Sequence, residues 1–342
     1  MSLLTQPLKI KNTVLSNRLV MPPMATAKSG ENGTVTTELC DYYKEKSQGG
    51  YIGLIITEHS YVSLTGKASP NQLSIACDED IDGLKKLVSV IHQNGSKAFA
   101  QINHAGGVAV GGNTGYEKFS ASSIQLPNAR PNNPALPKEM ADSDIQNVIQ
   151  EFAQSARRAK LAGFDGVEIH SAHGYLLNQF YSPLTNKRTD SYTGSTLEGR
   201  IKLHLEIINA VRETAGTDFP IAVRLGACDY ADGGSFIQDS VKASKAFEEA
   251  GVSLLDISGG FCGYTNPTSQ EQGYFSEITR EIKKHVSIPV ILTGGITSAA
   301  AAEELLENNS ADLIGVGRAL LKDSLWAEKA IHTLQSLSLI HI

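Results

Sequence analysis

The chain has 342 residues, of which 41% are hydrophobic, and its 30 Lys and Arg against 36 Asp and Glu give a net charge of −6. This composition is that of a globular protein with an ordinary core, and the lack of a basic stripe argues against nucleic acid as a partner. The length exceeds that of a typical domain, but an α/β barrel commonly takes it as one unit. We therefore expect a single domain over residues 1–342.

The N-terminal segment and the cysteines bear on the cellular compartment. Residues 1–12 contain no apolar run of signal-peptide length, and no run elsewhere reaches the length that spans a membrane. The cysteines are far apart and form no CxxC pair, which argues against an iron–sulfur cluster or a structural zinc site. They are Cys40, Cys77, Cys228 and Cys262. We expect a cytoplasmic protein without a metal centre or a membrane partner, and the sequence leaves open whether it forms a homo-oligomer.

Residues 1–17 have the pattern of a short β-hairpin. Two apolar runs, residues 8–10 and 13–15, flank the turn-forming pair Lys11-Asn12. A hairpin that precedes the first strand of a barrel can close the bottom of that barrel. We predict this position for it.

Eight strand-like apolar runs follow, separated by helical patterns. None of them alternates cleanly between apolar and polar residues, which is typical of a parallel sheet covered on both faces. The runs are residues 18–24, 51–57, 98–103, 166–170, 220–225, 254–258, 289–293 and 312–316. Helical spacing is clearest over residues 145–162, 201–214, 241–250, 278–285 and 299–306. The pattern predicts a closed (β/α)8 TIM barrel; an open doubly wound sheet is the alternative, but it has no reason to stop at eight strands.

The connection after the third strand, residues 105–140, is unusually long. It is rich in Gly, Asn, Pro and Ser, and such a loop inside a compact domain usually has a function. Its punctuating residues are Gly106, Gly107, Gly111, Gly112, Pro127, Pro131, Pro134 and Pro137. Because it leaves the carboxyl end of a strand, where barrel enzymes carry their active sites, we predict that it covers a substrate. A loop with no such role, or one that contacts another subunit, is the alternative.

A polar cluster follows the apolar run that contains Val167 and Ile169. It consists of His170, His173 and Tyr175. Two imidazoles and a phenol at the carboxyl end of a strand can bind an oxygen atom and deliver a proton, and a core strand needs none of them there. A single His would more often be structural, whereas three such groups within six residues favour a site.

The neighbouring strands end in further polar groups. Gln101 lies in the third run, and Arg224 interrupts the apolar fifth run, where it must meet a polar ligand or form a structural salt bridge. The seventh and eighth runs lead into Thr293-Gly-Gly-Ile296 and Gly315-Val-Gly-Arg318. Such glycine turns bind phosphate in this fold, although plain βα turns also favour glycine. Together with residues 256–260, which can close one side, these groups suit a flavin mononucleotide (FMN).

Longer motifs extend this picture over nearly the whole chain. They are Asn17-Arg-Leu-Val-Met-Pro-Pro-Met24, Gln101-Ile-Asn-His-Ala-Gly106, His170-Ser-Ala-His-Gly-Tyr-Leu-Leu-Asn-Gln-Phe180, Ser182-Pro-Leu-Thr-Asn-Lys-Arg-Thr-Asp190, Val223-Arg224 and Gly315-Val-Gly-Arg318. On these motifs the chain resembles the Old Yellow Enzyme family of flavin-dependent ene-reductases. It looks closest to the bacterial branch that includes the N-terminal barrel of 2,4-dienoyl-CoA reductases. Those larger relatives carry a cysteine cluster that is absent here, so we expect electrons to come from diffusing NAD(P)H.

The resemblance implies an FMN-dependent oxidoreductase that uses NAD(P)H to reduce the C=C bond of activated alkenes, such as α,β-unsaturated carbonyl compounds. His170 and His173 would bind the substrate oxygen, and Tyr175 would donate a proton as general acid. Residues that would bind FMN are Pro23, Met24, Ala25, His59, Gln101, His170, Arg224, Gly260, Gly294, Gly295, Gly317 and Arg318.

Some positions depart from the family pattern and leave alternatives open. Ala25 stands where relatives place Thr or Cys, and Ala27 where some bacterial relatives place Tyr. His59 stands where a small residue is common, so it either touches the flavin through its backbone or narrows the pocket. The alternative functions are another FMN-barrel reaction, such as dehydrogenation or demethylation, and a non-catalytic flavin-binding barrel. The sequence does not distinguish NADH from NADPH.

Overall fold

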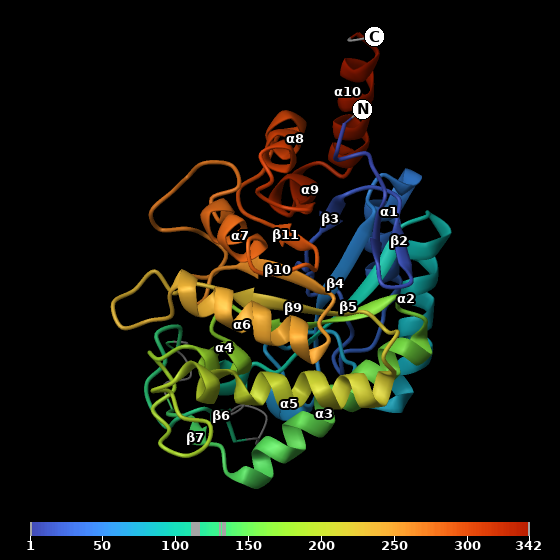
Figure 1. The fold of residues 1–342 in the computed structure, drawn as a ribbon. Coiled ribbons are helices and arrows are strands. Elements are labelled where there is room, and N and C mark those ends of the chain that lie inside the picture. The colour runs from blue at the N-terminus through green and yellow to red at the C-terminus, as the bar shows by residue number, and fades with distance from the viewer. Residues whose placement is uncertain (1, 111–116, 130, 132–134, 341–342) are drawn as a thin grey trace.

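The computed structural model describes residues 2–110, 117–129, 131 and 135–340. Its centre is a closed barrel of eight parallel strands, with the helices outside it (Figure 1). The barrel strands are β3 (Leu19–Met21), β4 (Leu54–Tyr61), β5 (Lys97–Asn103), β8 (Gly166–Ser171), β9 (Ile221–Gly226), β10 (Leu254–Ser258), β11 (Val290–Leu292) and β12 (Leu313–Gly315). Each overlaps one of the eight predicted runs, so the predicted (β/α)8 barrel is confirmed.

The helices follow the strands in chain order. They are α1 (Thr37–Ser47), α2 (Ile81–Gln93), α3 (Asp142–Ala162), α4 (Leu176–Tyr181), α5 (Leu197–Ala215), α6 (Ile237–Ala250), α7 (Ser276–Lys283), α8 (Ala299–Glu307), α9 (Arg318–Lys322) and α10 (Trp326–Ile340). Local chemistry fixes several of their ends. The Thr196 hydroxyl accepts from the Gly199 N–H at the start of α5, and Gly163 adopts φ 94° after α3. In the described chain, no helix combines the length and apolar character needed to cross a membrane.

The predicted N-terminal hairpin is present as β1 (Leu8–Ile10) paired antiparallel with β2 (Thr13–Leu15). Ile10 and Leu15 are fully buried, and they pack with apolar residues from the amino-terminal parts of the strands, such as Leu54. The hairpin therefore closes the end of the barrel opposite the carboxyl ends of the strands, as predicted.

The second barrel strand differs from its prediction at both ends. The apolar run predicts a strand over residues 51–57, but β4 begins at Leu54 and continues to Tyr61. Its register against β5 shifts between Thr57 and Ser60. The extension was not predicted because Glu58, His59 and Ser60 are polar. A run of apolar residues is the signal for a buried strand, and a segment whose side chains face a polar site lacks that signal.

Short pairings draw the long connection together at its described parts. β6 (Phe119–Ser120) and β7 (Lys138–Glu139) pair in parallel, so a segment from the middle of the loop lies beside its carboxyl-terminal end. Gly111, Gly112 and Pro134, which the sequence singled out, lie outside the described residues.

Replacing Ile10 by Ala should lower the free energy of unfolding by about 2 to 5 kcal/mol, because a fully buried side chain leaves a cavity. Val14 lies on the same hairpin with 53% of its surface exposed, so Val14→Ala should change that free energy by less than about 0.5 kcal/mol. Denaturant unfolding of both variants measures the difference. Equal effects would show that the hairpin does not belong to the barrel core.

Candidate active site

His170, His173 and Tyr175 lie together at the carboxyl end of β8. The ring centroids of His170 and His173 are 5.2 Å apart, as are those of His170 and Tyr175. A turn brings them together: His173 and Gly174 adopt positive φ angles of 58° and 72°. The Gly174 N–H donates to Asn178 Oδ1 at 2.7 Å, which holds the turn against α4. A positive φ is uncommon outside glycine and marks positions that the surroundings enforce.

Both imidazoles of the cluster are neutral at physiological pH. Burial lowers the pKa of His170 and of His173 well below the usual value, and the positive charge of Arg224 adds to the effect. A neutral imidazole has one N–H donor and one acceptor nitrogen. His173 Nε2 shares a 2.8 Å hydrogen bond with Ser258 Oγ, while His170 Nδ1 has no hydrogen-bond partner among the described residues. The pair can bind an oxygen atom on which negative charge develops.

A third imidazole, that of His59 on β4, lies beside this cluster. Its ring centroid is 5.6 Å from that of Tyr175 and 6.4 Å from that of His170. The sequence left open whether His59 touches the flavin through its backbone or narrows the pocket. The extension of β4 places its ring among the residues predicted to bind substrate.

A buried charged group lies deeper in the barrel, around Arg224. Strand register places Arg224 opposite Asp256 on β10 and opposite His170 on β8, and Gln101 opposite Glu168. Arg224 Nε is 3.4 Å from Asp256 Oδ2, and Gln101 Nε2 donates to Glu168 Oε1 at 2.8 Å. Sequence analysis missed Glu168 as a site residue. Its signal was present, because Glu168 is two residues before His170 and therefore points to the same side of the strand.

This charged group contains several polar atoms that lack a hydrogen-bond partner among the described residues. They are Arg224 Nε, Glu168 Oε2 and both carboxylate oxygens of Asp256. Buried polar atoms are normally paired, so this arrangement fits a polar ligand edge that donates and accepts hydrogen bonds. The pyrimidine edge of a flavin has this character, and the residues present therefore fit the FMN that the resemblance implies.

The predicted phosphate residues follow adjacent strands. β11 and β12 pair in register, and they lead into Gly294, Gly295, Gly317 and Arg318. A Cβ on Gly317 would approach Met24 Sδ to 3.3 Å, so this glycine lets the end of β12 pack against the segment that follows β3. That segment also carries Pro23 and Ala25, and the Glu58 carboxylate accepts from the Thr26 N–H at 2.6 Å to fix it against β4.

The loop after β10 is tied to Arg318 and to a buried carboxylate. Arg318 Nη2 donates to the Tyr274 hydroxyl at 3.0 Å, and this hydroxyl donates to the Tyr264 carbonyl at 2.5 Å. The Asp229 carboxylate accepts from the Ser182 hydroxyl at 2.6 Å and from the Phe261 N–H at 2.9 Å. A Cβ on Gly260 would lie 2.2 Å from Asp229 Oδ1, so the predicted Gly260 is needed for this packing. Sequence analysis gave no role to Asp229, since its partners come from separate loops.

Described parts of the long connection contact the cluster. Asn128 Nδ2 donates to the carbonyl oxygens of His173 and Gly174 at 3.3 and 3.5 Å. Tyr175 packs against a small apolar group that includes Val108 and Leu126 from the connection. The connection thus contacts the turn that carries His173 and Tyr175, and its covering role stays a prediction.

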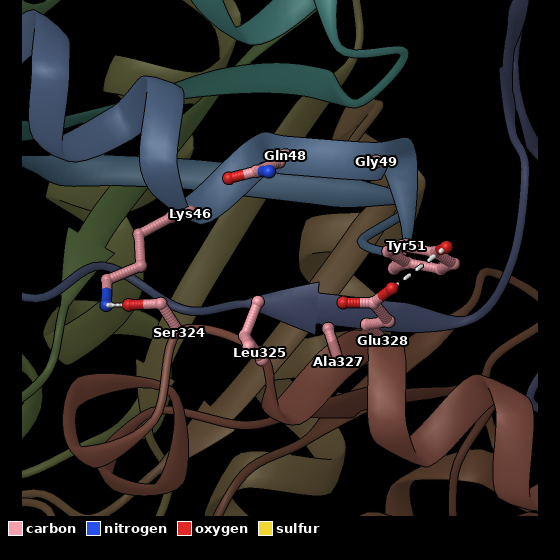
Figure 2. Close-up of a pocket in the computed structure, with 8 residues that line it drawn as sticks. All are labelled: Lys46, Gln48, Gly49, Tyr51, Ser324, Leu325, Ala327 and Glu328. Carbon is pink, nitrogen blue, oxygen red and sulfur yellow. Dashed lines mark hydrogen bonds between the residues drawn. The ribbon is translucent and has the colours of Figure 1, made fainter.

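A separate pocket of about 120 Å³ lies away from the cluster (Figure 2). It is lined by Lys46, Gln48, Gly49, Tyr51, Ser324, Leu325, Ala327 and Glu328. Its polar groups pair with one another: Lys46 Nζ donates to Ser324 Oγ at 2.5 Å, and the Tyr51 hydroxyl donates to Glu328 Oε1 at 3.5 Å. None of the predicted site residues lines this pocket. Among the described residues, no group of three or more His, Cys, Asp or Glu side chains is arranged to hold a metal ion.

Sequence comparison relates the chain to known flavin enzymes. A profile described as the NADH:flavin oxidoreductase / NADH oxidase family matches residues 3–336. An NADH oxidase of Thermoanaerobacter brockii is 40% identical over 328 residues, and the alignment covers 94% of this chain and 50% of that protein. The chain therefore spans about half the length of this curated relative.

Solved structures with the same barrel include a reductase and an old yellow enzyme homologue. A complex of 2-naphthoyl-CoA reductase with 2-naphthoyl-CoA aligns with a TM-score of 0.91 and 25% identity, over 97% of this chain and 52% of that one. An old yellow enzyme homologue from Zymomonas mobilis aligns with a TM-score of 0.84 and 24% identity, over 96% of this chain and 92% of that one. Both alignments agree with the barrel described above.

Replacing Asp256 by Asn should make the stability of the ligand-free protein less dependent on pH. Burial raises the pKa of the Asp256 carboxyl from 3.8 to about 6, against the opposing effect of Arg224, so the folded protein binds this proton more tightly than the unfolded chain. The resulting stability is complete below about pH 4 and is lost as the pH rises through about 6. Denaturant unfolding between these pH values should show a smaller fall in the free energy of unfolding for Asp256→Asn than for the wild type.

The control for this experiment is Asp82→Asn, whose side chain is 88% exposed. It should retain the pH dependence of the wild type. If Asp256→Asn also retained it, the raised pKa would belong to another group.

Proposed function

Because the chain belongs to the NADH:flavin oxidoreductase / NADH oxidase family, we propose that it binds FMN at the carboxyl ends of the barrel strands and uses NADH or NADPH to reduce the C=C bond of activated alkenes. The observation that carries this proposal is the cluster of His170, His173 and Tyr175. The ring centroid of His170 is 5.2 Å from that of His173 and 5.2 Å from that of Tyr175. Two neutral donors for an oxygen and one phenol for a proton are what reduction of an unsaturated carbonyl compound requires.

FMN would occupy the space between the charged group and the glycine turns. Gln101 and Arg224 would meet the pyrimidine edge of its ring, and Gly295, Gly317 and Arg318 would meet its phosphate. Pro23, Met24, Ala25, Gly260, Gly294 and the backbone of His59 would complete the surroundings. When bound, FMN supplies two-electron transfer between the nicotinamide and the alkene.

The side chains of the cluster would divide the remaining work. His170 and His173 would donate N–H groups to the carbonyl oxygen of the substrate, which polarises the alkene and stabilises the enolate that develops. Both imidazoles are neutral, so each donates its N–H to this oxygen as a hydrogen bond and does not release that proton to solvent. Tyr175 would then donate its phenolic proton to the α-carbon, and the covering connection around Val108 and Leu126 would exclude water from this step.

The test of the proposed function is a cycle of flavin colour without oxygen. FMN-loaded protein should lose its yellow absorbance when NADH or NADPH is added and regain it when cyclohexenone follows. Protein that bleaches with the nicotinamide but does not recover with cyclohexenone or other activated alkenes would support the reduction of FMN by the nicotinamide. It would refute activated alkenes as the substrate. Protein that takes up no FMN would refute both.

Replacing Tyr175 by Phe should slow the reoxidation of reduced flavin by cyclohexenone about 10²- to 10⁴-fold, because the general acid is lost. Bleaching by the nicotinamide should slow far less, since that step needs no proton from Tyr175. Stopped-flow absorbance measures both steps. Tyr51→Phe, in the separate pocket, is the matched control and should behave as the wild type. An unchanged reoxidation rate in Tyr175→Phe would exclude the proton-donor role.

Replacing Arg318 by Ala should weaken FMN binding about 10- to 150-fold, which is the loss of a charge-assisted hydrogen bond to phosphate. Riboflavin lacks the phosphate, so its binding should weaken far less. Flavin fluorescence titrations of the apoprotein measure both dissociation constants. An equal loss of affinity for FMN and riboflavin would show that Arg318 does not contact the phosphate.

A further inference from the structure

The feature that the proposed function does not use is the side chain of His59. It lies on the unpredicted extension of β4, next to the register shift between Thr57 and Ser60. Glu58 and Ser60 on either side of it are buried, while His59 is partly exposed. The bulged strand therefore turns this one side chain towards the space that the cluster surrounds.

Gln72 fixes the orientation of the His59 ring and the position of its proton. The Gln72 amide is buried, and its Oε1 accepts from the Ala68 N–H at 2.6 Å. The NH₂ end must therefore face His59, where it donates to Nδ1 at 2.6 Å and to the carbonyl oxygen at 3.0 Å. An amide NH₂ group only donates, so Nδ1 is the acceptor and the proton of the neutral ring is on Nε2.

The neighbours of the ring are the groups proposed to bind substrate. Its centroid is 5.6 Å from that of Tyr175 and 6.4 Å from that of His170. His170 and His173 are one pair of donors, and they can hold one oxygen. His59 lies on β4 and His170 on β8, so the His59 ring borders the cluster from a different strand.

We propose that His59 is a third substrate-binding imidazole, which donates its Nε2–H to a second oxygen of the alkene, away from the oxygen held by His170 and His173. This inference rests on the proposed function and deepens it. The substrate class becomes alkenes that carry two oxygen acceptors, such as enediones and unsaturated dicarbonyl compounds. Gln72 is the positioning residue, because it fixes which nitrogen of His59 carries the proton.

The first test compares cyclohexenone, which has one oxygen, with para-cyclohexenedione, which has two. Wild-type holoenzyme should prefer the dione. His59→Phe keeps a ring but removes the donor, and the ratio of kcat/KM for the dione to that for the enone should fall about 3- to 10-fold, the loss of one hydrogen bond. His59→Gln provides an amide donor and should recover part of the ratio. An unchanged ratio in His59→Phe would overturn the proposal.

The second test measures binding and needs no turnover. Isothermal titration calorimetry of oxidised, FMN-loaded protein with cyclohexanone and para-cyclohexanedione gives two dissociation constants. His59→Phe should weaken the dione about 3- to 10-fold more than the monoketone. If His59→Phe instead weakens FMN itself, or weakens both ketones equally, the side chain serves the flavin or the packing and the proposal fails. Wild-type protein that reduces neither alkene but still shows the difference in binding would refute the proposed reaction alone.

Discussion

The contact between Arg224 and Asp256 inside the barrel is the interaction on which the rest of the site depends. A lone buried guanidinium would be costly, and the 3.4 Å approach of Asp256 supplies only one partner for it. Burial lowers the pKa of His170 and of His173, and the same positive charge of Arg224 lowers both further. The register of β8, β9 and β10 therefore places Arg224 beside both Asp256 and His170.

Much of the fold could be predicted from the sequence, since the positions of the apolar runs determine it. All eight barrel strands and the hairpin were located because their residues are buried, and the family predicted from the motifs is confirmed. The predictions were incomplete where polar residues continue a strand or join distant loops. Glu58 and His59 extend β4 without an apolar signal, and Asp229 gathers donors from segments 47 and 32 residues away. The roles of the predicted site residues stay predictions.

The region above the barrel is held together by polar contacts to the backbone. Asn128 binds the turn after β8, and the guanidinium of Arg188 donates to the carbonyl oxygens of Met140 at 2.7 Å and Ala121 at 3.2 Å. Asp229 joins the loops after β9 and β10 in the same way. Such contacts fix these loops through the polar groups of their backbone.

The left-handed backbone at His173 restricts how this enzyme can evolve. At φ 58° a β-branched or bulky residue would be strained, whereas Asn, Asp, His and Gly tolerate the conformation. Of these four, Asp is an acceptor when ionised and Gly has no side chain, so only His and Asn keep a neutral N–H donor at this point. Under the proposed function, a residue at position 173 has both to adopt this backbone and to keep a neutral N–H donor, and His and Asn meet both demands.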